Sequence, residues 1–345
     1  MKKIAAWIHN GRTTALPQSL TPAILAAVMA LGVGFCWWTA ILAVIGVVFA
    51  HLAMNLADDY FDYKVDMKGD RDKVIRQGFR AMSVKYPFLT DGSATLSDTV
   101  KAIVQMGIVA VACGLAGFIR TTAVNGFGGH DGSWWIVAIV AVTAFVGMSY
   151  SAPPLKLGYR GLGELVIGVI FGPLLMMGVY YASCGRMNWG IVAVSIPVGL
   201  LVMNILFVHS IIDRPADTES NKMTFARVLG SDRANVIAEM VIVAVPFVMV
   251  LTAVCAGALS PLYLIVFVLL PRAVWLCWSV VKFARGEEID TTKPAWYLGQ
   301  MQNWQAILDA GLGWFMIRWF TARNLLSGFC ILCAVAKIVS MLCQA

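Results

Sequence analysis

Charged residues are scarce in this chain of 345 residues: Asp, Glu, Lys and Arg together make up only 13% of it. Hydrophobic residues make up 59%, and the mean hydropathy is +0.77. A water-soluble domain does not need so much apolar surface, and it needs more charge on its exterior. The composition therefore excludes an ordinary soluble enzyme and indicates a protein that crosses a membrane several times.

The chain also lacks features that would divide it into parts. It contains no obvious linker and no low-complexity segment, and its opening Met1-Lys2-Lys3 shows no cleavable signal pattern, because Arg12 and Pro17 interrupt before any apolar run. The eight cysteines all lie in or next to apolar stretches, where cysteine packs as a small apolar residue. We expect one integral-membrane domain over residues 1–345.

The apolar runs predict an all-α fold with about nine transmembrane helices. Each run is near the length that a bilayer requires. The expected spans are 17–34, 38–58, 97–119, 134–152, 162–183, 189–212, 234–256, 260–282 and 324–343.

Basic residues indicate the orientation of these spans. If the N-terminus lies in the cytoplasm and the loops alternate, 21 of the 26 Lys and Arg fall on the cytoplasmic side, and only Arg120 and Arg186 fall in the opposite loops. This is a strong positive-inside pattern. The net charge of +7 therefore reflects topology and contact with anionic lipid or phosphate, and we expect no nucleic-acid partner.

Acidic residues cluster at the cytoplasmic end of the second span. On a helix, positions 55, 59, 62 and 66 share one face, and Asp58 joins the same side by steps of four to Asp62 and Asp66. Carboxylates so close to a membrane are costly unless a cation holds them. Mg²⁺ would relieve their repulsion and usually brings a substrate phosphate with it. A merely solvated acidic helix end is the alternative, but it does not explain the recurrence of carboxylates downstream.

The second acidic cluster lies at the end of the sixth span, with Asp213 and Asp217 four residues apart. Pro215 stands between them, so Asp213 is expected to cap a new short helix that has Pro215 in its first turn. His209, one turn earlier, is either a packed polar residue or a ligand. Lys222 and Arg227 follow, either as anchors on the positive side or as partners of an anionic ligand.

A third segment, 150–164, joins the fourth and fifth spans on the same side. Pro153 and Pro154 predict an extended turn, and Lys156 and Arg160 add two cations. Three cytoplasmic loops are thus expected to bring carboxylates, Lys and Arg together. That composition is typical of a metal–diphosphate site beside a lipid-facing cavity.

These residues resemble the UbiA prenyltransferase superfamily. Asp58-Asp59-x-x-Asp62-x-x-x-Asp66 is similar to its first aspartate motif, and Asp213-x-x-x-Asp217 is similar to the second. The likeness covers about residues 5–235 and is greatest to the branch that prenylates 1,4-dihydroxy-2-naphthoate in menaquinone biosynthesis. That branch is matched by the segment 157–164, by Phe171-Gly172-Pro173 and by residues 221–230. The chain departs from the pattern at Asp58, which replaces the usual Asn, and at Ile212, Pro215 and the 283–323 loop.

The resemblance implies transmembrane helices around a central cavity that opens laterally to lipid, in a bacterial-type inner membrane with the active site facing the cytoplasm. It also implies Mg²⁺-dependent transfer of a polyprenyl group from polyprenyl diphosphate to an aromatic acceptor. The implied metal-binding and catalytic residues are Asp59, Asp62, Asp66, Asp213 and Asp217. Asn55 and Asp58 are expected to support them, and the diphosphate is assigned to Arg71, Arg76, Lys156, Arg160 and Lys222.

Two alternatives stay open at this point. One is a UbiA-type enzyme with another acceptor, such as 4-hydroxybenzoate or a glycerol phosphate ether. The other is a cation-coupled transporter, which would use intramembrane carboxylates and would explain Arg272 inside the eighth span. A transporter should hold its carboxylates near the bilayer midplane. Here they fall at span ends on one side, which favours the enzyme.

Overall fold

The computed structural model describes residues 2–66, 86–219 and 223–343, which are almost entirely helical. The described part contains no β-strand, only an isolated bridge between Arg160 and Met223. The longer α-helices are α2 (Pro17–Met29), α3 (Trp37–Asp66), α6 (Leu96–Asn125), α7 (Trp134–Ser151), α9 (Leu175–Cys184), α10 (Val192–Ile212), α13 (Asp232–Cys255), α14 (Leu270–Ala284) and α16 (Gly313–Leu342). The shorter ones are α1 (Lys2–Asn10), α5 (Pro87–Thr90), α8 (Gly163–Val169), α11 (Arg214–Glu219), α12 (Phe225–Leu229) and α15 (Trp304–Asp309).

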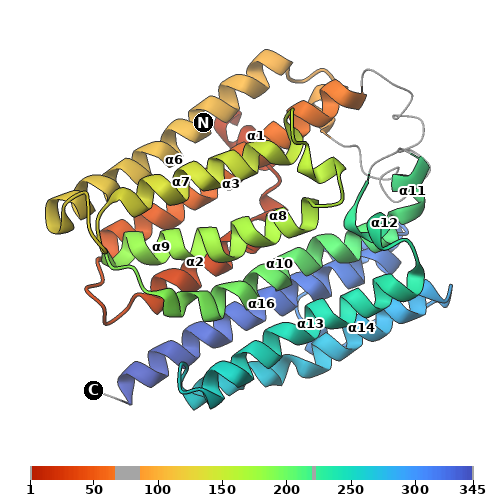
Figure 1. Ribbon diagram of the computed structural model, residues 1–345. Helices are drawn as coiled ribbons and strands as arrows, with labels where there is room; N and C mark the ends of the chain where they lie inside the picture. The colour runs from red at the N-terminus through yellow and green to blue at the C-terminus, as the bar shows by residue number, and fades with distance from the viewer. Residues whose placement is uncertain (1, 67–85, 220–222, 344–345) are drawn as a thin grey trace.

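The long helices lie side by side along one common direction (Figure 1). Helices α3, α6 and α7 form one side of the bundle, α13, α14 and α16 form the other, and α10 packs against α8, α13 and α16. In the most apolar part of α10, 72% of the residues are buried, compared with 17% in α7. Helix α10 is therefore central, while α7 presents apolar side chains to the membrane.

Eight helical segments in the described residues are long and apolar enough to cross a bilayer. The all-α, polytopic membrane fold predicted from the sequence is thus confirmed. The first expected span, 17–34, forms α2, whose 13 residues reach only about 20 Å and are too short to cross a bilayer. The chain leaves the helix before Gly32 and Gly34, which both have the positive φ angles that favour glycine.

Small residues let the two sides of the bundle approach closely beside the π-helical turn Ile170–Leu174. A Cβ atom added at Gly172 would lie 2.5 Å from the Cα atom of Gly199 on α10, and one added at Gly168 would lie 2.9 Å from the Gly199 carbonyl oxygen. Such contacts between backbones are typical of membrane helices. They hold α8 against α10 and so fix the spacing of the loops at one end of the bundle.

Candidate active site

The first aspartate cluster forms the last turns of α3. Asp59 and Asp62 are almost fully buried, at 1% and 4% exposure, and the side chain of Asp58 is 26% exposed. The guanidinium of Arg12, from the segment before α2, donates a hydrogen bond to Asp59 and lies 3.7 Å from the Asp58 carboxylate. The cluster is therefore partly balanced by a cation that lies 47 residues earlier in the chain.

Arg12 stays charged in this setting. Burial by itself would lower the pKa of Arg12, but the charges of Asp59 and Asp58 outweigh that effect and raise its pKa above the ordinary value. Asn55 supports the same segment from α3, because its side-chain amide donates to the Gly11 carbonyl at 2.8 Å. This contact positions Arg12, and the expected role of Asn55 in support of the metal-binding aspartates stays a prediction.

Two hydroxyl groups reach the cluster from the α7–α8 connection. Ser151, the last residue of α7, donates to Asp58 Oδ1 at 2.6 Å, and the Tyr159 hydroxyl donates to Asp62. The two contacts therefore fix the orientation of the Asp58 and Asp62 carboxylates.

The second cluster has the local structure that Pro215 predicted. Asp213 caps α10, and α11 begins at Arg214 with Pro215 in its first turn. Asp213 and Asp217 are each 3% exposed, and the Asp217 backbone N–H donates to the Asp213 carbonyl at 2.8 Å. His209 Nε2 lies 2.9 Å from Asp213 Oδ2, and its ring packs edge-on against Phe315, as expected for a packed polar residue; a role as a ligand stays a prediction.

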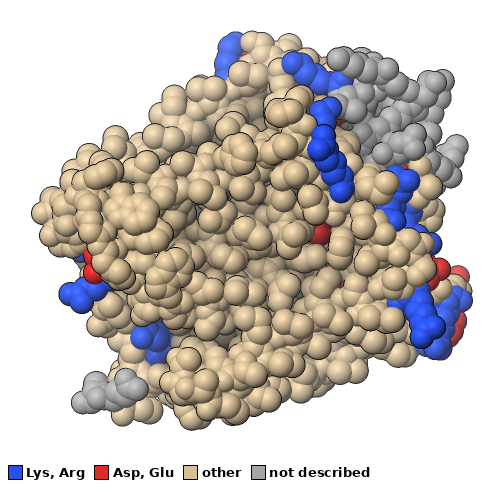
Figure 2. Space-filling view, in the orientation of Figure 1, with Lys and Arg blue, Asp and Glu red and all other residues tan. Residues whose placement is uncertain are grey.

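One cavity of about 170 Å³ joins the two clusters. Its polar lining comes from α3, α7, α8, α10 and the segments near them, and consists of Arg12, Asp58, Asp62, Tyr150, Tyr159, Glu164, His209, Ser210, Asp217 and Thr224. In Figure 2 an acidic side chain is visible within a hollow right of centre, in a face whose broad middle is uncharged. Lys and Arg gather toward the right-hand end, where α11 lies.

Glu164 holds the walls of this cavity together. Its carboxylate accepts hydrogen bonds from the Ser210 hydroxyl at 2.5 Å and from the Phe225 backbone N–H at 3.2 Å. The neighbouring Gly161 donates from its backbone to the Met223 carbonyl at 2.9 Å, with a φ of 77° that favours glycine. The α7–α8 connection and the segment before α12 are thereby fixed to each other.

The predicted diphosphate ligands are only partly placed by the structure. Lys156 is half-buried at the start of the turn Leu157–Tyr159, and Arg160 is exposed with its guanidinium 3.3 Å from the Pro154 carbonyl. Neither lines the cavity, and their contact with a diphosphate stays a prediction. Arg71, Arg76 and Lys222 lie outside the described residues, as does the side chain of Asp66.

Sequence reasoning missed Arg12, Ser151 and Tyr159 as parts of the site. Each lies 47 to 97 residues from the carboxylate that it contacts. The signal that could have found Arg12 was its position: a lone cation just before an apolar run, on the same side of the membrane as the acidic clusters.

The donor set suits a hard cation. It consists of carboxylate oxygens, which Mg²⁺ prefers, and it lies beside space for further ligands. Within the described residues, no three His, Cys, Asp or Glu side chains come close enough to hold a metal ion by themselves. This arrangement fits Mg²⁺, which is usually bound through one or two carboxylates together with water and substrate phosphate.

A helical membrane bundle in which two carboxylate clusters and a guanidinium share one cavity is typical of one class of protein: membrane proteins that bind an anionic ligand together with a cation. Comparison with known protein families then identifies the family. The model of the UbiA prenyltransferase family matches residues 19–304, so the chain belongs to this family and is a prenyltransferase, as the motifs predicted.

Curated relatives carry the name 1,4-dihydroxy-2-naphthoate octaprenyltransferase. The Mycobacterium tuberculosis protein is 26% identical over 239 residues, which cover 69% of this chain and 74% of that protein. The Bacillus subtilis protein is 24% identical over 272 residues, which cover 76% of this chain and 78% of that protein. The predicted similarity to this branch is thus confirmed.

Solved structures support the fold. A UbiA homologue from Aeropyrum pernix K1 matches with a TM-score of 0.60 and 16% identity over 96% of this chain and 99% of that chain. A UbiA homologue from Archaeoglobus fulgidus bound to GPP and Mg²⁺ matches with a TM-score of 0.53 and 13% identity over 92% and 99%. The chain is an integral membrane protein with this helical arrangement.

Proposed function

We propose that the protein transfers a polyprenyl group from polyprenyl diphosphate to 1,4-dihydroxy-2-naphthoate, in an Mg²⁺-dependent step of menaquinone biosynthesis. The observation that carries the proposal is that one cavity is lined by Asp58 and Asp62 from one cluster and by Asp217 from the other. The names of the relatives supply the acceptor, and the Mg²⁺-bound homologue supports the metal.

The acidic and the basic residues of the site are proposed to bind different groups. Asp59, Asp62, Asp66, Asp213 and Asp217 are the proposed metal-binding residues, with Asn55 and Asp58 in support. When bound, Mg²⁺ would neutralise the charge that builds up on the departing diphosphate. Lys156, Arg160, Lys222, Arg71 and Arg76 are proposed to bind the diphosphate oxygens.

Breaking the bond between the prenyl carbon and the diphosphate oxygen leaves an allylic cation. The electron-rich ring of the acceptor attacks this carbon and then loses a proton. Aromatic side chains such as Tyr150 and Tyr159 face the cavity and can stabilise the cation through their ring faces. Burial of the site limits competing attack by water.

The site is proposed to face the cytoplasm of a bacterial-type inner membrane, within one domain of 345 residues. The excess of Lys and Arg on the site's side of the membrane supports this orientation. Cysteines introduced at Ser93 and Gly128 test it, because they lie at opposite ends of α6. Only the variant at Ser93 should react with an impermeant reagent added from the cytoplasmic side.

The reaction is tested directly with purified protein in lipid. Labelled polyprenyl diphosphate, Mg²⁺ and one candidate acceptor at a time are supplied, and the product is identified by mass. We expect prenylated 1,4-dihydroxy-2-naphthoate, and loss of the product on adding EDTA. A product formed only from 4-hydroxybenzoate or a glycerol phosphate ether would reject the acceptor and keep the reaction class, whereas Mg²⁺-independent turnover would reject the metal assignment.

A further inference from the structure

The segment between α14 and α16 does not leave the bundle as an ordinary loop. Its turn at Trp296–Leu298 is tied to both flanking helices. Arg272 on α14 donates from Nε to the Tyr297 carbonyl at 2.8 Å and from Nη1 to the Asn324 carbonyl on α16 at 2.7 Å. The half-buried arginine inside the eighth expected span is therefore an anchor for this turn.

Asn324 completes the anchorage from α16. Its side-chain amide donates to the carbonyls of Leu298 and Gln300, both at 3.0 Å. Gly299, with a φ of 90°, lies so close that an added Cβ atom would be 2.8 Å from the Asn324 amide nitrogen. Leu298 is 1% exposed. Side chains of the two membrane helices thus donate hydrogen bonds to three carbonyls of this segment, those of Tyr297, Leu298 and Gln300.

Arg272 and Asn324, which hold the turn, lie several helical turns inside α14 and α16. Arg272 precedes the end of α14 at Ala284 by 12 residues, and Asn324 follows the start of α16 at Gly313 by 11 residues. At 1.5 Å per residue these offsets correspond to about 18 Å and 16 Å, from which the length of the Arg272 side chain must be subtracted. The chain therefore runs back along the bundle from Ala284 to the turn and returns to Gly313.

The segment has a charged first part and an uncharged second part. Glu287, Glu288 and Asp290 lie in its first part, whereas residues 294–308 contain no Asp, Glu, Lys or Arg and are bounded by Lys293 and Asp309. Non-helical backbone at membrane depth is tolerated only where its polar groups are satisfied. Arg272 and Asn324 satisfy the carbonyls of this turn, as that rule requires.

Tryptophan exposure points to what covers the turn. Trp296, in the turn, is 91% exposed. Trp278 on α14 and Trp314 on α16, the two helices that hold the turn, are 45% and 39% exposed. Exposed tryptophans around a membrane helix bundle mark the interfacial layer of the bilayer, where the indole is in contact with both apolar and polar groups. An indole that faced only water would bury no apolar surface. Its exposure on an uncharged, anchored turn therefore favours contact with lipid.

We propose that residues 294–308 form a re-entrant hairpin that lies in the interfacial layer of the bilayer, on the side of the membrane that holds the active site. Trp296 contacts lipid, and Arg272 keeps the hairpin at this depth. The proposal concerns a lipid-binding surface and does not depend on which substrates the cavity accepts.

Cysteine accessibility tests the depth of the hairpin. Trp296→Cys and the control Glu288→Cys, at an exposed position in the charged part, are each placed in phosphatidylcholine nanodiscs with one copy per disc. Labelling by an impermeant maleimide is read by peptide mass spectrometry, which separates the new site from the eight native cysteines. We expect labelling at 296 to be about tenfold slower than at 288 or more, because the reagent is excluded from the bilayer.

Equal labelling rates at 296 and 288 would overturn the proposal, since both positions would then lie in water. After denaturation both variants should label equally, which controls for intrinsic reactivity. Discs with a single copy exclude shielding by a second protein molecule. Protection that appears only at two copies per disc would assign the surface to a protein contact and would also overturn the proposal.

The anchor is tested in the Trp296→Cys background. Adding Arg272→Met removes the donors to the Tyr297 and Asn324 carbonyls, and labelling at 296 should rise several-fold toward the rate at 288. The matched control is Arg285→Met, which removes a cation from an exposed position and should leave the protection intact. Unchanged protection in the Arg272 variant would reject arginine anchoring, while the single Trp296→Cys variant still decides the depth if the double variant fails to fold.

Discussion

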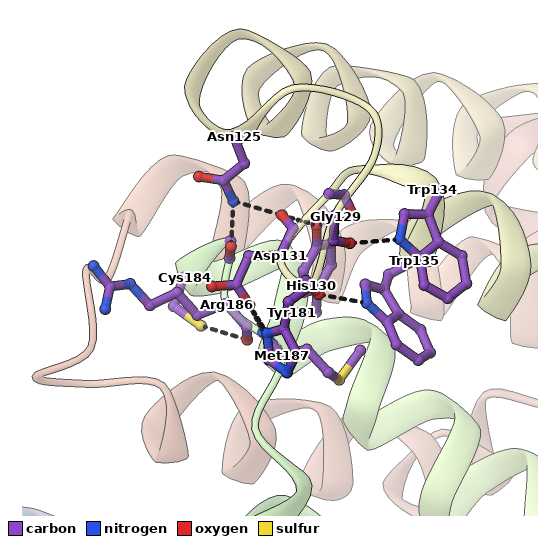
Figure 3. A network of polar contacts seen from close by, with 12 residues as sticks. Asn125, Gly129, His130, Asp131, Trp134, Trp135, Tyr181, Cys184, Arg186 and Met187 are labelled. Carbon is purple, nitrogen blue, oxygen red and sulfur yellow. Dashed lines mark hydrogen bonds and ion pairs between the residues drawn. The ribbon is translucent and has the colours of Figure 1, made fainter.

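The carboxylate of Asp131 at one end of the bundle and the carboxylates of Asp58, Asp59 and Asp62 at the other end have different kinds of partner. Figure 3 shows the Asp131 end, where the turn between α6 and α7 meets the end of α9. Asp131 Oδ1 accepts from the Met187 backbone N–H at 2.9 Å and lies 3.0 Å from Nδ1 of the adjacent His130, and the Asp131 carbonyl accepts from Asn125 and Tyr181 at 2.8 and 3.0 Å.

Most partners in the Asp131 network are main-chain groups. Trp134 and Trp135 donate from their indole nitrogens to the carbonyls of Gly129 and His130, at 2.9 and 2.8 Å. The buried Tyr181 also donates to the Gly132 carbonyl at 2.6 Å. Such a network closes two loops and meets the demand that buried backbone groups make for hydrogen bonds.

The first aspartate cluster of the candidate site is instead held by side chains from distant parts of the chain. Arg12, Ser151 and Tyr159 contact it, and the cavity beside it extends to the second cluster. The comparison teaches that the partners of a carboxylate indicate its role. Main-chain partners indicate that a loop is being fixed, and side chains arranged around a cavity indicate charge directed at a ligand.

Replacing a carboxylate at each end should give the largest contrast. Asp62→Asn removes a proposed metal ligand and keeps the side-chain shape. Because partners of metal ligands alone are worth roughly 10–100-fold, we expect activity to fall by at least about a hundredfold. The assay is prenyl transfer at saturating Mg²⁺, with membrane-inserted protein quantified. Asp131→Asn is the control and should keep turnover per folded molecule. Near-normal activity in Asp62→Asn would remove the basis for the two-cluster site.

Lys156→Met should have the next largest effect. The substitution keeps the length of the stem and removes the charge, so a hydrogen bond to phosphate worth on the order of 1.5–3 kcal/mol is lost. We expect donor affinity or rate to fall roughly ten- to a hundredfold, with acceptor affinity nearly unchanged. Binding of the two substrates is measured separately. A loss confined to the acceptor would instead place Lys156 on the acceptor's carboxylate.

Arg12→Met probes charge balance at the site end. Asp59 would lose its guanidinium partner, and because the Arg12 side chain is 40% exposed we expect a loss of stability of only about 1–2 kcal/mol. Thermal unfolding in detergent measures it. The double variant Arg12→Met/Asp59→Asn should be more stable than the sum of the two single effects, because the unbalanced charge has been removed. Simple additivity would show that the two side chains do not interact.

Tyr181→Phe should give the smallest effect and should act on stability alone. It removes the hydroxyl that donates to the carbonyls of Asp131 and Gly132, a loss of about 1 kcal/mol. The unfolding midpoint should drop by a few degrees, while turnover per folded molecule stays the same. A specific loss of turnover in this variant would mean that the Asp131 end is coupled to the active site, and the contrast between the two ends would no longer hold.

The transmembrane pattern and the aspartate clusters could be predicted because their signals are local. Hydropathy over about twenty residues marks a span whatever it packs against, and a four-three-four spacing places carboxylates on one helix face by geometry alone. Pro215 likewise marked the start of α11, since proline is favoured in a first helical turn. The short α2 shows where this approach ends, because hydropathy did not reveal how the chain turns at Gly32 and Gly34.

By itself, then, the sequence determined the membrane class, the helical fold, the acidic motifs and the family that these motifs resemble. Only the tertiary structure decided that Arg12 pairs with Asp59, that Tyr159 reaches Asp62, and that Arg272 anchors a turn 25 residues further along the chain. The physical reason is that side-chain partners depend on which helices pack together. Packing is decided by shape over the whole bundle, as at Gly172 and Gly199, and such shape leaves no periodic trace in the sequence.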